Sequence, residues 1–255
     1  MVHIVGAGCG APDLITLRGS RYIAAADVII YAGSLVNPEL LSGAKDGCEI
    51  SDSAKMTLEE ITEKISEAEK SGLMTVRLHS GDPSLYGAVR EQMDILEKEQ
   101  IPYDVTPGVS SFLAAAAALR EEYTLPGVSQ TVILTRMEGR TPVPERESLA
   151  KLAVHGASMV IFLSASMTAG VQEALLQGAY TKKTPAAIVC RTGWPREKLI
   201  RCTVGTLHEN AQKEGITKTA LILVGDFLKR EAGAERSRLY DPSFTTGYRK
   251  GNNET

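Results

Sequence analysis

Short apolar runs alternate with segments of helical spacing through the first half of the chain. Four short segments are predicted to be strands: residues 2–5 and 28–31 are apolar runs, and residues 74–78 and 103–106 each precede a predicted helix. Apolar positions recur at helical spacing in four further segments: residues 14–26, 57–72, 85–98 and 111–119. This alternation predicts an α/β domain with a mainly parallel sheet, whose ligand lies at the carboxyl ends of the strands.

The pattern breaks at residues 120–127, which contain Pro126 and Gly127, and a second α/β domain then begins. Its expected strands are residues 131–135, 159–163, 186–190, 199–204 and 219–225, with helices at 146–154 and 167–176. A turn at 194–197 predicts a hairpin and therefore a mixed sheet. We expect an N-terminal domain at 1–120, a C-terminal domain at 121–232 and a polar extension at 233–255.

Composition limits the class of protein. The chain has 255 residues, of which 43% are hydrophobic and 23% charged, as is typical of a globular protein and not of a disordered one. No apolar run approaches the ~20 residues that cross a bilayer. The N-terminus lacks the basic stretch and cleavage site of a signal peptide, which predicts a cytoplasmic protein that binds no membrane.

Charge is unevenly distributed. Residues 1–117 contain 9 Lys and Arg against 17 Asp and Glu, whereas residues 118–255 contain 19 against 14. A basic second half would attract an acidic ligand, or the two halves would simply attract each other. Aromatic residues make up 5% and there is no basic stripe, so we expect no nucleic-acid partner. The four cysteines and four histidines show no metal-ligand spacing, so we expect no metal site.

The first glycine-rich segment, Gly6-Ala-Gly-Cys-Gly-Ala11, follows a strand and fits the dinucleotide fingerprint. That fingerprint also needs an acidic residue at the end of the second strand to hold the ribose. Here the second strand ends in Tyr31-Ala-Gly-Ser34, without a carboxylate. A nicotinamide-dependent oxidoreductase is therefore only a distant alternative.

Two more glycine loops join a strand to a helix. His79-Ser-Gly-Asp-Pro-Ser-Leu-Tyr-Gly87 carries a carboxylate, and Thr106-Pro-Gly-Val-Ser-Ser111 carries hydroxyls at a helix start. Asp82 could cap a helix or bind an amine or hydroxyl of a ligand. Three such loops on one sheet edge indicate a site for a small polar ligand.

Several blocks of the chain resemble the tetrapyrrole (cobalamin-precorrin) methyltransferases. The shared blocks are GAGCGAPDLITLRG (6–19), SGDPSLYG (80–87), TPGVSS (106–111) and TALILVG (219–225). Longer blocks resemble the branch that methylates carbon 11 of precorrin-4: YAGSLV (31–36), RLHSGDPSLYGA (77–88), PGVSQTVILTR (126–136), GRTPVPERE (139–147) and CRTGWPREKLIRCTVGTL (190–207).

The resemblance implies two α/β domains with S-adenosylmethionine bound in the cleft between them, and a homodimer. The substrate would be cobalt-precorrin-4 or metal-free precorrin-4. The resemblance places the cofactor on Gly8, Cys9, Ser80, Gly81, Asp82, Leu85, Ser110, Ser111, Leu163, Thr192, Thr219 and Ala220. Core packing is the other interpretation of Leu163. Ala11 stands where many relatives have an acidic residue, so no general base is assigned and the catalytic residues are unknown.

A tetrapyrrole carries many carboxylates, so its pocket should contain basic side chains. The candidates are Arg18, His79, Arg136, Arg140, Arg191 and Arg196, with Arg77 on the second loop's strand. Three alternatives remain at this point. They are a sister methyltransferase acting on another ring carbon or on uroporphyrinogen, the oxidoreductase above, and a tetrapyrrole carrier that has lost its cofactor.

Overall fold

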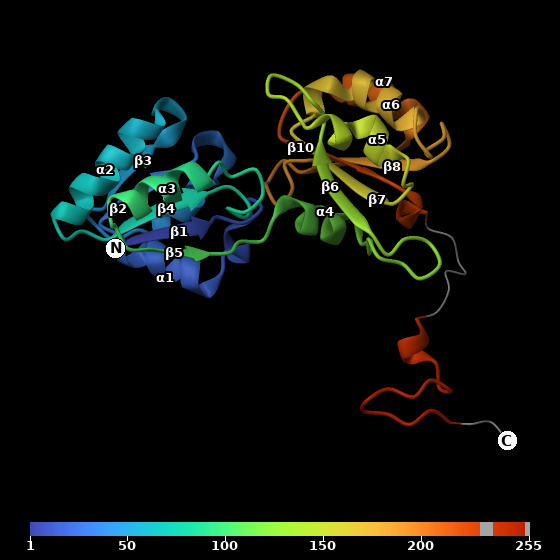
Figure 1. Ribbon diagram of the computed structural model, residues 1–255, viewed down its shortest axis with the longest axis horizontal. Coiled ribbons are helices and arrows are strands. Elements are labelled where there is room, and N and C mark those ends of the chain that lie inside the picture. Colours follow the sequence, from blue (N-terminus) through green and yellow to red (C-terminus); the bar gives the residue numbers. More distant parts are fainter. Residues whose placement is uncertain (230–236, 253–255) are drawn as a thin grey trace. The chain divides into compact units, whose positions relative to one another are not determined.

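The computed structural model describes residues 1–229 and 237–252 (Figure 1). By packing, the chain divides into two units. The first contains Met1–Ala115 with Arg191–Lys198, and the second contains Ala116–Cys190 with Leu199–Thr255. The domain limits expected above stay a prediction, and the parts of the polar extension at 233–236 and 253–255 lie outside the described residues.

The first unit is built on a five-stranded sheet in the order β3-β2-β4-β1-β5, in which every pairing is parallel. Its strands are β1 (Val2–Gly6), β2 (Val28–Tyr31), β3 (Glu49–Asp52), β4 (Thr75–His79) and β5 (Tyr103–Thr106). Its helices are α1 (Leu17–Ala25), α2 (Leu58–Lys70) and α3 (Arg90–Lys98), and α4 (Ser111–Leu119) follows β5.

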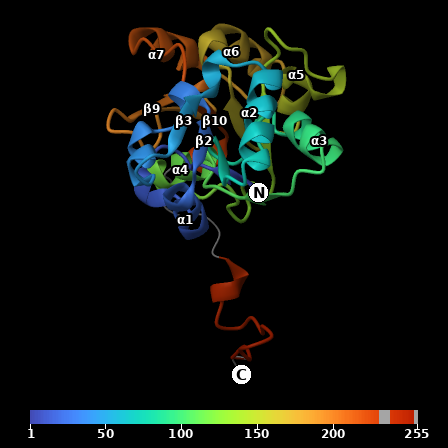
Figure 2. The ribbon, with the colours of Figure 1, turned by 90° about the vertical axis from the view of Figure 1, so that its left-hand side faces the viewer.

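Side chains alternate across this sheet and form two cores. On one face, Ile23 of α1 packs with Val5, Ile29 and Val76. On the other, Ile65 of α2 and Leu96 of α3 pack with Val2 and Ile30 of the strands. Helices thus cover both faces, α2 and α3 on one side and α1 on the other (Figure 1 and Figure 2). Because both faces are buried, the strand ends are where a ligand can reach the sheet.

The second unit has a mixed sheet in the order β6-β7-β10-β8-β9. β6 and β7 are parallel, and β10 runs antiparallel to β7 and β8. The strands are β6 (Val132–Arg136), β7 (Ser158–Phe162), β8 (Pro185–Cys190), β9 (Lys198–Thr203) and β10 (Ala220–Val224). One core joins them to the helices α5 (Leu149–Ala153), α6 (Thr168–Leu176) and α7 (Leu207–Lys213). The predicted α/β class, with one parallel and one mixed sheet, is confirmed.

One difference from the expected elements has a local cause. The helix expected at 85–98 begins only at Arg90, because Tyr86 and Ala88 have φ values of 54° and 47°, which a right-handed helix excludes. The tail at 237–252 contains one short 3-10 helix, Arg238–Tyr240. No helix of the described ranges has the length and apolar character needed to cross a membrane.

Candidate functional site

Three glycine-rich loops meet at the carboxyl edge of the first sheet. They follow β1, β4 and β5, which are neighbours in the order β4-β1-β5. The first two loops pair through their backbones, since Gly8 N donates to Gly81 O at 3.1 Å and Gly81 N donates to Gly8 O at 2.9 Å. Both glycines have positive φ values, 76° and 61°, which residues with a side chain rarely adopt.

Close backbone approach explains why glycine stands at the meeting point. A Cβ added to Gly6 would lie 2.6 Å from the nitrogen of Gly108, and one added to Gly108 would lie 2.2 Å from the Gly81 oxygen. Neither distance is possible for a real side chain. The three loops therefore form a cradle of peptide groups, and a ligand that binds there meets backbone donors and acceptors.

Asp82 ties the second loop to the third. Its Oδ2 accepts from Gly108 N at 2.9 Å, and its Oδ1 accepts from Ser84 N at 2.9 Å and from the Ser84 hydroxyl. Burial raises the pKa of the Asp82 carboxyl, but these hydrogen bonds outweigh burial, so the pKa lies below its usual range. A carboxylate that stays ionised at neutral pH can bind an ammonium group.

The remaining cofactor candidates of the first unit lie on the same three loops. Cys9 and Ser110 are buried, whereas Ser80, Leu85 and Ser111 are half-buried. Ser111 is the first residue of α4, whose N-terminal N–H groups have no partner inside the helix. Thr192 is buried within the segment Arg191–Lys198, which packs with this unit.

The second unit brings its own candidates together at one edge of its sheet. Leu163 directly follows β7 and Ala220 begins β10, and because these neighbouring strands run antiparallel, both residues lie at the same edge of the sheet. Leu163 and Thr219 both have a φ of 53°. Left-handed backbone at non-glycine residues is costly and is concentrated at functional sites. Leu163 is 65% exposed, so core packing does not explain it.

The substrate candidates differ in accessibility. Arg18, Arg140, Arg191 and Arg196 are exposed, and none of them has an ion pair within residues 1–229 and 237–252. Arg136 instead donates to the backbone oxygens of Met137, Thr141 and Pro142, and so closes the loop after β6.

His79 is only 3% exposed, and burial together with the nearby Arg77 lowers its pKa to about 3. A side chain so deeply buried has no surface for a carboxylate of the substrate. Arg77 is also buried and donates to Gln92 Oε1 at 2.9 Å. Both side chains therefore belong to the interior of the first unit.

Two residues that contact the first glycine loop, Asn37 and Trp194, are not among the site residues predicted from sequence. Asn37 Nδ2 donates to Gly10 O at 2.7 Å in a buried position, and the indole of Trp194 lies against Gly10. A single signal could have found the second: Trp194 is the one tryptophan of the chain. The Asn37 contact joins segments 27 residues apart and leaves no local pattern.

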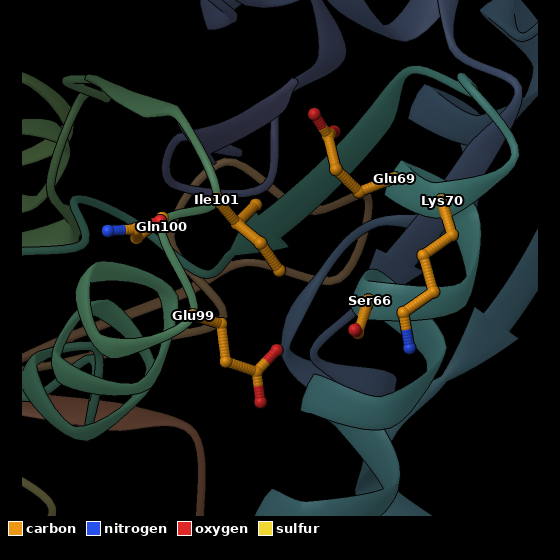
Figure 3. Close-up of a pocket in the computed structure, with 6 residues that line it drawn as sticks. All are labelled: Ser66, Glu69, Lys70, Glu99, Gln100 and Ile101. Carbon is orange, nitrogen blue, oxygen red and sulfur yellow. The ribbon is translucent and has the colours of Figure 1, made fainter.

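A separate hollow of about 460 Å³ lies elsewhere on the first unit (Figure 3). Its lining residues come from the end of α2 and from the segment before β5: Ser66, Glu69, Lys70, Glu99, Gln100 and Ile101. These segments precede β4 and β5, so the hollow is at the amino edge of the sheet, opposite the glycine loops. Among the described residues, no group of three or more metal-ligating side chains could hold a metal ion.

The donor set fits S-adenosylmethionine. The cofactor's amino-acid end carries an ammonium and a carboxylate, which suit the Asp82 carboxylate and the peptide N–H groups of the loop cradle. Tight glycine contacts keep the cradle free of side chains that would fill it.

These features describe an α/β protein whose three glycine loops, at the carboxyl edge of a parallel sheet, offer peptide groups and one carboxylate to a small polar ligand. The family model of tetrapyrrole (corrin/porphyrin) methylases matches residues 1–208. The chain belongs to this family.

Individual relatives are more specific. The chain is 52% identical over 249 residues to a cobalt-precorrin-4 C(11)-methyltransferase of Methanocaldococcus jannaschii, covering 98% of this chain and 96% of the relative. It is 44% identical over 240 residues to a precorrin-4 C(11)-methyltransferase of Mycobacterium tuberculosis, covering 94% and 95%. The crystal structure of a cobalt precorrin-4 methyltransferase aligns with a TM-score of 0.88 at 44% identity, covering 89% of this chain and 95% of that one.

Proposed function

We propose that this chain is an S-adenosylmethionine-dependent methyltransferase that adds a methyl group to carbon 11 of cobalt-precorrin-4 during corrin ring synthesis. The observation that carries the proposal is similarity along nearly the whole chain, 98% of it, to an enzyme named for this reaction. The loop cradle supports it, because its peptide groups and ionised Asp82 suit the cofactor. We further propose that the protein works as a homodimer in the cytoplasm.

In this reaction the protein's main contribution is to orient the two reactants, because the cofactor already carries an activated methyl group. Bound S-adenosylmethionine supplies a methyl group on a positively charged sulfur. Carbon 11 would donate an electron pair to that methyl as the carbon–sulfur bond breaks, and the sulfur would leave with its electron pair as S-adenosylhomocysteine. The positive charge would pass to the conjugated ring nitrogen, which becomes neutral again by releasing its proton to solvent. Because a reduced tetrapyrrole carbon is an enamine-like nucleophile, the protein's contribution is to align the two reactants and exclude water.

We propose that the two groups of candidate residues bind different parts of the cofactor. The polar end is held by Asp82 with the backbone of Gly8, Cys9, Ser80, Gly81, Leu85, Ser110, Ser111 and Thr192. The adenine is held by Leu163, Thr219 and Ala220. The exposed arginines Arg18, Arg140, Arg191 and Arg196 are candidates for the carboxylates of the tetrapyrrole.

The test has two stages. Calorimetric titration with S-adenosylhomocysteine, with NADH as the control, establishes whether the cofactor site exists. We expect one molecule bound per chain at micromolar affinity or tighter and no binding of NADH. The enzyme is then incubated with S-adenosylmethionine carrying a ¹³C-methyl group and either cobalt-precorrin-4, precorrin-4 or uroporphyrinogen III, and the methylated carbon is located by NMR.

Methylation of carbon 11 supports the proposal, and the preferred ring distinguishes the cobalt-bound from the metal-free substrate. Methylation of uroporphyrinogen III alone would assign the chain to a sister reaction. Binding of NADH without S-adenosylhomocysteine would overturn the methyltransferase assignment altogether.

A further inference from the structure

The loop between β8 and β9, Arg191–Lys198, packs on the first glycine loop. A Cβ added to Gly10 would lie 2.2 Å from Nε1 and 2.4 Å from Cδ1 of Trp194, so the indole rests directly on the Gly10 backbone. Gly193, the residue before Trp194, also lies against the first glycine loop, because a Cβ added to it would lie 2.9 Å from the nitrogen of Ala11. Two glycines with positive φ, 121° and 76°, thus allow the two loops to touch.

The loop is held in this shape by its own hydrogen bonds. Trp194 N donates to Arg191 O at 3.0 Å, Glu197 N donates to Trp194 O at 3.0 Å, and Gly193 N donates to Glu197 Oε2 at 2.8 Å. Glu197 is therefore used inside the loop. From the other side, Asn37 fixes Gly10 by its 2.7 Å hydrogen bond. Hydrogen bonds within Arg191–Lys198 and the bond from Asn37 to Gly10 therefore both fix the position of the indole.

Three side chains of this loop have the chemistry to bind a flat, anionic ligand. The half-buried Trp194 ring is flat and apolar, and the exposed Arg191 and Arg196 on either side of it in sequence have no ion pair among the described residues. An indole and two unpaired guanidinium groups on one short loop suit a flat ring system that carries carboxylates. S-adenosylmethionine has one carboxylate and needs only one such partner.

We infer that Arg191–Lys198 is the substrate-recognition loop, in which Trp194 packs against the tetrapyrrole ring while Arg191 and Arg196 bind its carboxylates. This inference rests on the proposed function and assigns substrate contacts within it. Trp194 determines specificity for the tetrapyrrole, whereas cofactor affinity rests on the three glycine loops and on Thr192 of the same loop. The close contact with Gly10 sets where the ring lies.

The test compares affinities for two ligands, S-adenosylhomocysteine and cobalt-precorrin-4, by calorimetry. We expect Trp194→Ala to weaken tetrapyrrole binding about tenfold or more, since an aromatic contact is lost together with its buried area. We expect Trp194→Phe, which keeps an aromatic ring, to lose less. S-adenosylhomocysteine affinity should change by less than about threefold in both variants, which corresponds to under ~0.7 kcal/mol.

Arg196→Gln gives an independent arm, because an exposed side chain can be replaced without unfolding the protein. It should weaken cobalt-precorrin-4 alone, about fivefold or more. The matched control is Arg146→Gln in the second unit, whose side chain is 85% exposed and pairs with Glu147. This control should leave both affinities unchanged.

Equal losses for both ligands in Trp194→Ala would show that the indole only supports the first glycine loop, and would overturn the inference. Unchanged tetrapyrrole affinity in both Trp194→Ala and Arg196→Gln would also overturn it. If the wild-type protein bound neither ligand, the proposed function itself would fail. The two failures are therefore distinguishable.

Discussion

Two buried polar side chains lie side by side on β4 of the first unit. Arg77 donates to Gln92 Oε1 at 2.9 Å and to the Ile30 and Leu78 oxygens at 3.1 and 3.4 Å, and burial lowers its pKa to about 10. His79, two residues further on, has a buried Nε2 with no hydrogen-bond partner in the described part of the chain. A cationic imidazole would be poorly solvated there and would repel Arg77, so His79 is neutral in the folded protein.

This burial predicts acid sensitivity from a single residue. The folded pKa of His79 is about 3, below its ordinary value of 6.5. Between these values the unfolded chain binds a proton that the native protein excludes, so stability is complete above about pH 6.5 and falls as the pH decreases. The loss is roughly 1.4 kcal/mol per pH unit. Urea unfolding of the wild-type protein and His79→Gln at pH 7 and pH 5 measures it.

The wild-type protein should lose about 2 kcal/mol more than His79→Gln between these two pH values. Every other titrating group is shared by both proteins, so the difference isolates His79. Equal losses in the two proteins would show that the imidazole accepts its proton in the folded state.

Arg136 is a substrate candidate from its place after an apolar strand, and its contacts give it a second, local role. Its guanidinium donates to the Thr141 and Pro142 oxygens at 3.1 and 2.6 Å. We expect Arg136→Ala to release this loop, so that trypsin cleaves after the exposed Arg140 several-fold faster, since cleavage follows local opening. Timed proteolysis followed by mass spectrometry measures the rate.

The same variant should weaken cobalt-precorrin-4 binding without changing S-adenosylhomocysteine affinity. Unchanged tetrapyrrole affinity would remove Arg136 from the substrate site and leave it as a loop-closing residue. Unchanged proteolysis would show that the three carbonyl contacts do not hold the loop.

At the scale of elements, the strands were easier to predict than the segments between them. β2, β5 and α4 have the limits expected from the sequence. Continuous apolar runs identify buried strands because both faces of the first sheet are covered. β3, Glu49–Asp52, was missed because all four of its residues are exposed or half-exposed and it shows no apolar run.

Some features of the candidate site are also predictable from a local sequence pattern, and others are not. The three glycine loops were located from sequence, because glycine between strand and helix is a local signal. The fit of Gly6 against Gly108, and of Trp194 against Gly10, joins segments about 100 and 180 residues apart. No local pattern encodes such contacts, so the backbone cradle and the tryptophan were found only from the structure.

The cradle predicts that Gly108 tolerates no side chain. Its φ is ordinary, so Gly108→Ala tests space alone, and its Cβ would lie 2.2 Å from the Gly81 oxygen. We expect a loss of about 1–3 kcal/mol in unfolding free energy, because the loops must move apart. S-adenosylhomocysteine affinity should fall more than tenfold, since its peptide donors move with the loops.

Gly43→Ala is the matched control. Its φ is also ordinary, and its Cβ would meet only the Ile23 Cγ2 at 3.9 Å. We expect stability and cofactor affinity close to those of the wild-type protein. If both alanine variants behaved alike in urea unfolding and calorimetry, the close approach of the three loops would contribute neither to stability nor to cofactor affinity.

At the scale of the whole molecule, the two sheets differ in construction and in charge. The parallel first sheet carries the glycine loops on its carboxyl edge. The mixed second sheet presents strained backbone at Leu163 and Thr219. Residues 1–117 have 9 basic against 17 acidic side chains, and the rest of the chain has 19 against 14. A polycarboxylate substrate should therefore be attracted mainly by the second half.

This charge distribution predicts a ligand-selective effect of salt. Exposed guanidinium groups such as Arg140 and Arg191 are screened as the Debye length falls from about 10 Å at 0.1 M salt to about 3 Å at 1 M. Cobalt-precorrin-4 affinity should therefore drop about tenfold over this range, measured by calorimetry. S-adenosylhomocysteine has no net charge, and its affinity should change less than about twofold. The other interpretation of the charge difference, attraction between the two halves, predicts instead that salt lowers the thermal unfolding temperature and leaves tetrapyrrole affinity unchanged.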